Sequence, residues 1–343
     1  MNKPSMYLSN VEYAKICESM GKSFLTPEVC NCNAPDTGNM EVLLHFGTVL
    51  QQQLYLKPLL DGSIRSAFLM TEPYVASSDA SNIETSLREN GVNETGEMTY
   101  ILNGRKWWST GAMDPRCKVF IILAKMKNAK KSSFTTIVIP SSRKGIQLIR
   151  PLTVFGHDDA PHGHAEVQLT NVIITSRDIV LGIGKGHTIA QARLGPGRVH
   201  HCMRAIGITS RCYELMLQRS IQRTTFKQPL YNHGMIQDLI SKCKIHLDSA
   251  RLLTLDCAHS MDTVGAKQCR EKIALIKIAI PDLCFRVVDC AVQVFGGGGV
   301  SDDYPIAQAF TSLRTLRIAD GPDEVHKRTL ARMEVRRVLQ SKL

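Results

Sequence analysis

The stretch that decides the fold begins with Phe68-Leu69-Met70-Thr71-Glu72-Pro73, continues through Ser77-Ser78-Asp79 and ends with Lys106-Trp107-Trp108-Ser109-Thr110. Hydroxyl side chains and aromatic rings alternate here with Gly, Pro and Asn, which favours short strands joined by turns. Asn103-Gly104 lies between Tyr100-Ile101-Leu102 and Lys106-Trp107-Trp108. That pairing predicts a tight type I′ hairpin.

Outward from this stretch, the β pattern extends over residues 68–183. Val119-Phe120-Ile121-Ile122-Leu123 and Thr136-Ile137-Val138-Ile139 are short β-branched runs, and Glu166-Val167-Gln168-Leu169 alternates polar with apolar residues. Such runs are typical of buried and half-buried strands. We expect a small antiparallel barrel or sandwich, with Gly182–Gly186 as a turn at its end.

The flanking regions have helical periodicity. Residues 1–67 predict a partial helical domain, interrupted near Pro27 and residues 33–38, and residues 184–343 predict a helical bundle. Two apolar stripes define its long helices: Ile236, Leu239, Ile240, Cys243, Leu247, Ala250 and Leu253, and then Ile273, Ile276, Ile280, Leu283, Val287, Ala291 and Val294. We expect Pro281 to kink the second helix and Gly296–Gly299 to end it. The predicted fold class is therefore multidomain α+β.

Composition excludes several classes. The 343 residues, 43% of them apolar, can bury a large core. The sequence contains no run of about 18 apolar residues, so we expect no transmembrane helix. No secretory signal is recognisable. The eleven scattered cysteines indicate reduced thiols, and the loop His157–His164 matches no common metal spacing. A net charge of +11 without aromatic-interleaved basic clusters argues against nucleic acid and leaves surface charge or phosphate attraction.

Two segments that contain turn residues have both a structural and a chemical interpretation. Asp320-Gly321-Pro322-Asp323 is a turn sequence, with Asp323 placed to begin a helix, but it also supplies a carboxylate. Arg193–His201 is interpreted either as a helix start with Pro196 near its first turn or as glycine-rich backbone that approaches a ligand. The pair His200-His201 we interpret as structural.

Taken in order, these motifs resemble the acyl-CoA dehydrogenase family from about Tyr13 to Arg337. The resemblance implies FAD as cofactor and α,β-dehydrogenation of a fatty acyl-CoA to a trans-2-enoyl-CoA, as in fatty acid β-oxidation. Three segments, 33–38, 195–198 and 320–326, are most similar to the branch that contains family members ten and eleven. Residues 1–67 are shorter than the family's usual N-terminal helical domain, so a truncated, non-catalytic flavoprotein is one alternative.

The resemblance also implies roles for individual residues. Asp320 matches the carboxylate base that removes the α-proton while hydride leaves for FAD, although the commonest residue there is the longer Glu. An alternative family position for the base is occupied here by Gly197, which cannot serve. Substrate contacts are expected at Ser78, Gly195, Pro196, Gly197, Arg198 and Gly321. FAD contacts are expected at Phe68, Met70, Thr71, Ser77, Trp108, Ser109, Thr110, Arg223, Phe226, Gln293, Gly296, Gly297, Pro322, Asp323 and Glu324.

Partners and location follow from the same resemblance and from the C-terminus. The family implies a homodimer or homotetramer with FAD at subunit contacts, and electron transfer to electron-transferring flavoprotein. Ser341-Lys342-Leu343 is typical of a peroxisomal address and predicts binding to the peroxisomal import receptor. In a peroxisome the alternative acceptor is oxygen, as in an acyl-CoA oxidase. A mitochondrial location is the alternative.

Overall fold

A computed structural model describes residues 8–127 and 133–341, without the side chains of residues 191–196 and 341. The chain divides into two compact units, one formed by Met1–Val29 with Gly195–Leu343 and the other by Cys30–Leu194. The predicted N-terminal domain is therefore divided. Its first helices belong with the C-terminal bundle, and the remainder belongs with the β structure.

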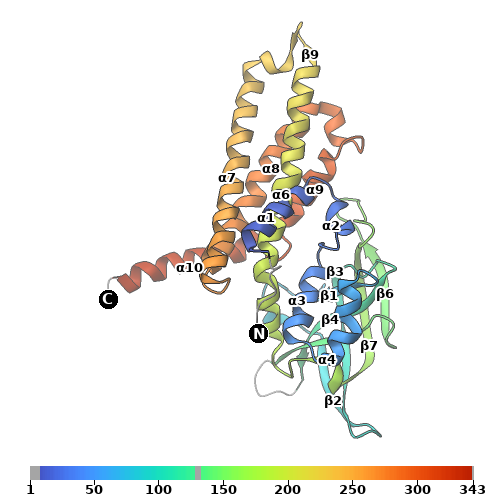
Figure 1. Ribbon diagram of the computed structural model, residues 1–343. Coiled ribbons are helices and arrows are strands. Elements are labelled where there is room, and N and C mark those ends of the chain that lie inside the picture. Colours follow the sequence, from blue (N-terminus) through green and yellow to red (C-terminus); the bar gives the residue numbers. More distant parts are fainter. Residues whose placement is uncertain (1–7, 128–132, 342–343) are drawn as a thin grey trace. The chain divides into compact units, whose positions relative to one another are not determined.

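The unit Cys30–Leu194 contains one eight-stranded sheet (Figure 1). Its strands run in the order β6-β7-β3-β2-β4-β5-β8, and β1 pairs with β4. Their bounds are β1 Arg65–Leu69, β2 Ser86–Val92, β3 Met98–Thr110, β4 Cys117–Met126, β5 Phe134–Pro140, β6 Ile146–Leu152, β7 His164–Thr175 and β8 Ile179–Val180. Most neighbours are antiparallel, as predicted, but β1 and β2 both run parallel to β4.

The predicted hairpin at Asn103-Gly104 is wrong. Both residues lie inside β3, where the pairing with β7 shifts between Leu102 and Gly104. Gly104 is needed there because a Cβ would collide with the side chain of Thr85. The turn between β2 and β3 instead lies at Asn93–Glu97, where the Asn93 amide donates to the Glu97 carbonyl over 2.9 Å.

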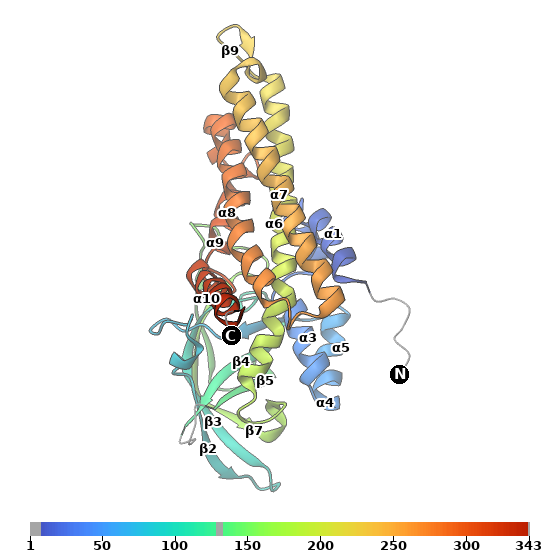
Figure 2. The same ribbon diagram turned by 90° about the vertical axis from the view of Figure 1, so that its left-hand side faces the viewer.

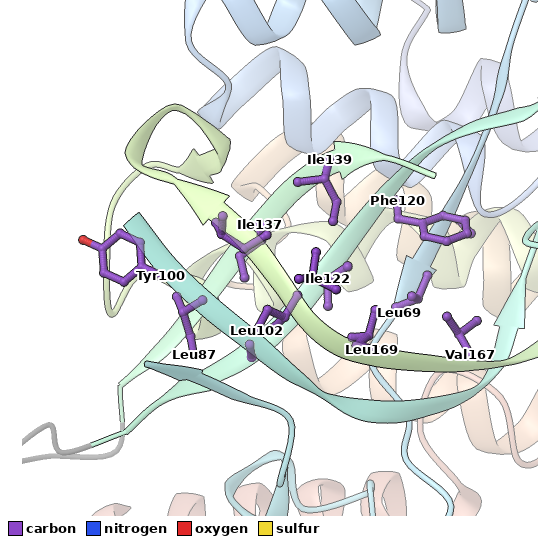
Figure 3. Close-up of a cluster of buried hydrophobic side chains, with 14 of the residues drawn as sticks. Leu69, Leu87, Tyr100, Leu102, Phe120, Ile122, Ile137, Ile139, Val167 and Leu169 are labelled. Carbon is purple, nitrogen blue, oxygen red and sulfur yellow. The ribbon is translucent and has the colours of Figure 1, made fainter. Parts of the chain in front are cut away.

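The central strand β4 is buried on both faces. Phe120 and Ile122 belong to one apolar cluster, shown in Figure 3 with Leu69, Ile137 and Leu169, around which the sheet curves. Val119 and Ile121, which alternation points to the opposite face, belong to a second cluster. Burial on both faces explains why the strand is an unbroken apolar run.

Helices cover the second cluster. They are α3 (Asp36–Phe46), α4 (Val49–Gln51), the π-helical turn Gln52–Leu56, and α5 (Lys57–Leu60). Val42 and Leu43 of α3 pack into that cluster together with Leu59 of α5. Asp36 of α3 accepts a hydrogen bond from the Ser66 amide of β1 over 2.7 Å, which ties α3 to the sheet.

The other unit is helical, as predicted. It contains α1 (Asn10–Gly21), α2 (Thr26–Val29), most of α6 (Gly186–Gln222), α7 (Gly234–Val264), α8 (Arg270–Phe295), α9 (Ile306–Leu316) and α10 (Asp323–Ser341). Helices α6, α7 and α8 lie side by side in both views (Figure 2). A short hairpin of β9 (Thr224–Thr225) and β10 (Gln228–Pro229) joins α6 to α7. Among the described residues, no helix has the length and apolarity needed to cross a membrane.

Three details of this unit bear on the sequence predictions. Helix α6 starts at Gly186, so Pro196 lies inside a helix rather than at its start. Helix α8 continues through Pro281 and ends at Phe295, where Gly296 takes a φ of 62°, as predicted for the glycine run. Gly299 must lack a side chain because a Cβ would lie 2.5 Å from the Val292 carbonyl oxygen.

Candidate active site

In the β unit, a buried ion pair fixes the start of the predicted flavin site. Lys106 is fully buried on β3, and its Nζ donates to Glu72 Oε1 over 2.8 Å and to the Met70 carbonyl over 3.0 Å. The Glu72 carboxylate also accepts the amides of Glu84 and Thr85 over 2.7 and 3.0 Å. These contacts hold the segment around Thr71 against β3. The Trp107 amide adds a further hydrogen bond, which it donates to the Thr71 carbonyl over 3.0 Å.

The electrostatics of this pair explain why both charges are tolerated in the core. Burial lowers the pKa of Lys106 to about 8, and Glu72 opposes that decrease. Burial alone would raise the pKa of Glu72, yet the Lys106 ammonium and the accepted hydrogen bonds bring it below its usual value. A buried charge of either sign without its partner would be strongly unfavourable.

Beyond Lys106, a bulge turns Trp108 outward. The β3–β7 register shifts between Lys106 and Ser109, and Trp108 takes a φ of 49°. Trp108 is 39% exposed, and its ring lies edge-on to His164, with 5.4 Å between ring centroids. Thr110 lies opposite His164 on β7, and its Oγ1 is 2.9 Å from His164 Nδ1.

Among the other predicted residues of this unit, only Ser78 is exposed. Ser109 is buried, and its hydroxyl has no hydrogen-bond partner within the described part of the chain. Ser77 accepts the Glu72 amide over 3.0 Å, so its hydroxyl shapes the loop, whereas Ser78 is exposed. Phe68 packs against the cluster under the helices, and Met70 is half-buried with its carbonyl bound to Lys106.

In the helical unit, the turn between α9 and α10 presents Asp320. Asp320 and Gly321 take φ values of 56° and 100°, and the Asp320 carbonyl accepts hydrogen bonds from Arg198 Nη2 and His326 Nε2, each over 3.2 Å. The side chain points elsewhere: its Oδ2 lies 3.2 Å from His201 Nε2. The backbone and the carboxylate of Asp320 are therefore held by different groups.

The residues around this turn account for its shape. A Cβ on Gly321 would lie 2.8 Å from His326 Nε2, so only glycine leaves room for that imidazole. Asp323 begins α10 as predicted and pairs with Arg317 over 2.8 Å. Buried Lys277 on α8 donates to the Leu316 carbonyl at the end of α9. The helices thus fix both ends of the segment that carries Asp320.

Burial lowers the pKa of both basic side chains that bind the Asp320 carbonyl. Burial lowers the pKa of His326 to about 4, and Arg198 adds to the effect, so His326 is neutral near pH 7. Burial likewise lowers the pKa of Arg198, which Asp320 opposes. Neutral His326 can donate from Nε2 to a carbonyl, as the geometry requires.

The remaining predicted residues lie at separate places in the helical unit. Arg223 and Phe226 lie by the β9–β10 hairpin, where both are exposed, Phe226 by 93%. Gln293, Gly296 and Gly297 lie exposed at the end of α8, and Glu324 lies exposed in the first turn of α10 beside half-buried Pro322. Gly197 faces open space. The side chain of Pro196, and what surrounds Gly195, lie outside the described part of the structure.

The sequence analysis missed several polar residues that contact the predicted site residues. We expected His201 to be structural, yet it contacts Asp320. His164 and Lys106 drew no separate attention, because only strand register brings His164 opposite Thr110 and only burial distinguishes Lys106 from a surface lysine. His326 stood within the quoted turn sequence and was detectable there. Among the described residues no group of three potential metal ligands is formed.

Comparisons with known proteins agree with this architecture. Residues 67–172 match the family model "Acyl-CoA dehydrogenase, middle domain", and residues 184–334 match "Acyl-CoA dehydrogenase, C-terminal domain". The chain is 48% identical to acyl-CoA dehydrogenase family member 11 of Gallus gallus over 332 residues, which cover 96% of this chain and 42% of that protein. It therefore spans about two fifths of that animal relative.

Two bacterial proteins match over more of their length. "Probable acyl-CoA dehydrogenase FadE2" of Mycobacterium tuberculosis is 46% identical over 333 residues, which cover 96% of this chain and 80% of that protein. A solved structure from Mycobacterium abscessus, described as an acyl-CoA dehydrogenase, is 44% identical with a TM-score of 0.92, covering 96% of this chain and 80% of that one. The predicted family and fold are thereby confirmed, and the chain belongs to the acyl-CoA dehydrogenase family.

Proposed function

We propose that this protein is an FAD-dependent acyl-CoA dehydrogenase in which Asp320 is the catalytic base. The observation that carries the proposal is the geometry of Asp320. Its carbonyl is held by Arg198 and His326, while its partly buried carboxylate is turned away toward His201. A carboxylate held on a fixed turn can remove a weakly acidic α-proton without first reorganising.

The surroundings suit that chemistry. Arg198 and His326 bind the backbone oxygen of Asp320, whereas its carboxylate lies on another side of the turn, beside His201. The amides of a glycine-containing turn can in addition donate to a developing enolate oxygen, which is the stabilisation that thioester α-deprotonation needs.

The residues of the β unit fit the flavin that the family implies. Trp108 offers an exposed aromatic face, and Thr110 and Thr71 lie beside it on a backbone that Lys106 and Glu72 hold rigid. An apolar ring with a polar edge is complementary to an aromatic face bordered by hydroxyls. Bound there, FAD would supply the acceptor for the β-hydride. Exposed Arg223 would suit its pyrophosphate, because guanidinium groups bind phosphate through two parallel hydrogen bonds.

The substrate class and acceptor belong to the same proposal. The family supports a fatty acyl-CoA that becomes a trans-2-enoyl-CoA, with electron-transferring flavoprotein as acceptor and a homo-oligomer as the assembly. The exposed positions of Gln293, Gly296 and Gly297 suit a role at a neighbouring subunit. Measuring hydrogen peroxide during turnover would distinguish electron-transferring flavoprotein from oxygen as the electron acceptor. The absence of hydrogen peroxide would contradict the use of oxygen.

Peroxisomal import is a further part of the proposal, supported by Ser341-Lys342-Leu343 alone. Lys342 and Leu343 lie outside the described residues. A fluorescent fusion carrying this C-terminus should enter peroxisomes, whereas removal of Leu343 should leave it diffuse. A fusion that enters mitochondria instead would favour the alternative location.

The test of the activity is an anaerobic flavin spectrum recorded before and after a panel of acyl-CoAs is added. We expect bleaching by at least one acyl-CoA, and loss of that bleaching in Asp320→Asn with the flavin still bound. Asp282→Asn is a matched control, because Asp282 pairs with Arg286 on the surface of α8, 2.9 Å away. Equal bleaching by Asp320→Asn would remove Asp320 as the base. A protein that binds no FAD would contradict the proposed function.

A further inference from the structure

Three side chains of the β unit form an unbroken line of hydrogen bonds. Asp159 Oδ2 lies 3.0 Å from His164 Nε2, and His164 Nδ1 lies 2.9 Å from Thr110 Oγ1. The imidazole is 11% exposed and Asp159 is 39% exposed, so the line runs from near the surface inward to the strand end. Thr110 is the residue next to the bulge that exposes Trp108, and the proposed function does not use His164 or Asp159.

The fold holds these groups in place. Thr110 and His164 are direct partners in the β3–β7 ladder, which fixes their side chains on the same face. The Gly111 amide donates to the Gly163 carbonyl over 2.9 Å, and the Gly163 amide donates to the Asp159 carbonyl over 3.0 Å. Gly163 takes a φ of 51°, and a Cβ there would lie 2.8 Å from Met113 Cβ. The loop that carries Asp159 is therefore tied to the end of β3.

The hydrogen-bond inventory fixes the direction of the line. The hydrogen bond with His164 holds the pKa of Asp159 below its usual value, so Asp159 is an anion that only accepts. His164 must then donate from Nε2. When the imidazole is neutral, Nδ1 is an acceptor and takes the Thr110 hydroxyl proton; when it is protonated, Nδ1 donates and the hydroxyl proton is released for another acceptor.

We propose that Asp159 and His164 set whether the Thr110 hydroxyl accepts or donates a hydrogen bond toward a flavin bound at Trp108, and so couple flavin reduction to the protonation of His164. This inference rests on the proposed function. Thr110 touches the cofactor in that proposal, whereas His164 and Asp159 are positioning residues that act through it. Among the described residues, other titratable groups near this line include His162, whose ring centroid lies 6.3 Å from that of His164, and His157, which acts on Asp159 electrostatically.

The coupling follows from the cofactor's own chemistry. N5 of an oxidised flavin accepts a hydrogen bond, and two-electron reduction places a hydrogen there, so that the same atom donates. Protonated His164 suits the first state because Thr110 can then donate, and neutral His164 suits the second because Thr110 can then accept. Reduction should therefore release the His164 proton to solvent while the flavin takes up its own. Protonation and reduction affect each other equally, as linkage requires.

The first test needs no flavin. In protein labelled with ¹⁵N-histidine, the imidazole shifts of His164 in its neutral form should report a proton on Nε2, and His164→Gln would assign the signal. Asp159→Gly, which keeps a residue that tolerates the φ of 55° at this position, should weaken that tautomer preference. A neutral His164 that carries its proton on Nδ1 in the wild-type protein would overturn the relay.

The second test measures the midpoint potential of the flavin in the FAD-bound, substrate-free protein from about pH 6 to about pH 9. Each proton exchanged per two electrons changes the slope by about 30 mV per pH unit. The wild-type slope should be shallower by up to that amount over part of this range. His164→Gln and Thr110→Val should both remove the shallow region, and the double variant should match the single ones because the residues act in series.

A matched control comes from the same loop. His162→Gln removes a neighbouring imidazole that is not part of the line to Thr110, and it should retain the wild-type profile. A flavin that stays bound in His164→Gln with an unchanged slope and potential would overturn the proposal while leaving the proposed function intact. Failure of the wild-type protein to bind FAD would contradict the proposed function and the role of Thr110 with it, and the tautomer measurement would still decide the direction of the line.

Discussion

The residue Asp320 shows how a single turn can separate a structural from a chemical task. A positive φ at a non-glycine residue costs about 1–2 kcal/mol, and the two hydrogen bonds to its carbonyl offset that cost. Those donors hold the backbone of Asp320, while its carboxylate contacts His201. Asp is one methylene shorter than the family's usual Glu, so a fixed backbone matters more here than it would for the longer side chain.

His326 makes the stability of this turn depend on pH. Its pKa is lowered to about 4 in the folded protein, so between about pH 6.5 and pH 4 the unfolded chain binds a proton that the folded chain does not. The free energy of unfolding should therefore fall as pH falls through that window, by on the order of 3 kcal/mol, and the loss should end below about pH 4. Urea unfolding across this range measures it.

The matched variants are His326→Gln and His187→Gln. His326→Gln should flatten the pH dependence attributed to this site, whereas His187, which is exposed at the start of α6, should leave it in place when replaced. A His326→Gln protein that loses stability with the same slope as wild type would contradict the assignment. Half-buried His200, whose pKa desolvation lowers to about 3, leaves a residual dependence in every variant.

At the scale of elements, the Lys106–Glu72 pair joins β3 to the segment after β1, and breaking it should be costly. Lys106→Met leaves the Glu72 carboxylate buried without its cation, and we expect a loss of about 3–5 kcal/mol in the free energy of unfolding. Adding Glu72→Gln should recover part of that loss, because the uncompensated charge disappears. Denaturant unfolding of the three proteins measures the coupling.

An exposed pair provides the comparison. Lys22 and Glu214 lie 2.8 Å apart with both side chains about half exposed, so Lys22→Met should cost no more than about 1 kcal/mol. If Lys106→Met cost as little as Lys22→Met, the buried pair would not anchor the Thr71 segment. A double variant less stable than Lys106→Met would contradict the charge argument.

Elements also show where sequence reasoning succeeds. The apolar run of β4 and the stripes of α7 and α8 were predictable, since burial on one or both faces imposes a period on the sequence. The failure of the predicted Asn103-Gly104 hairpin could not be foreseen from the sequence. The same two residues also fit a bulge inside a long strand when β7 and Thr85 pack beside them. Thr110 was found by resemblance, whereas His164 and Asp159 required the β3–β7 register, which local sequence does not encode.

For the whole molecule, the thiols report on the packing of both units. All eleven cysteines are thiols outside any disulfide; eight of them are buried, Cys30 is exposed, and Cys32 and Cys290 are intermediate. Burial raises the pKa of Cys117 and Cys212 to about 12, so those thiols are unreactive while folded. A thiol reagent should therefore modify about three cysteines in the native protein and eleven after denaturation.

The order of reaction adds a second criterion. A hydrogen bond with Cys243 lowers the pKa of Cys290 to about 7, so Cys290 should react ahead of Cys30 and Cys32. Mass spectrometry of partially modified protein identifies the sites. Fewer than eleven thiols after denaturation without reductant would reveal a disulfide and contradict the reduced state, and rapid reaction of Cys117 would show that the β core opens.

Cofactor binding should stabilise the molecule by mass action, because FAD binds the folded chain and not the unfolded one. At a free FAD concentration about one hundred times Kd, the stabilisation is about 2.7 kcal/mol, which corresponds to an increase in Tm of roughly 4 °C for a chain of 343 residues. Riboflavin 5′-phosphate, which lacks the adenylate half of FAD, should give a smaller increase in Tm. Arg223→Met should reduce the increase in Tm caused by FAD to about the value that riboflavin 5′-phosphate gives. Arg223 is exposed, so its replacement should leave the Tm of the flavin-free protein unchanged. Equal shifts with both flavins would mean that the pyrophosphate contributes nothing at Arg223, and no shift with either would exclude the flavin site itself.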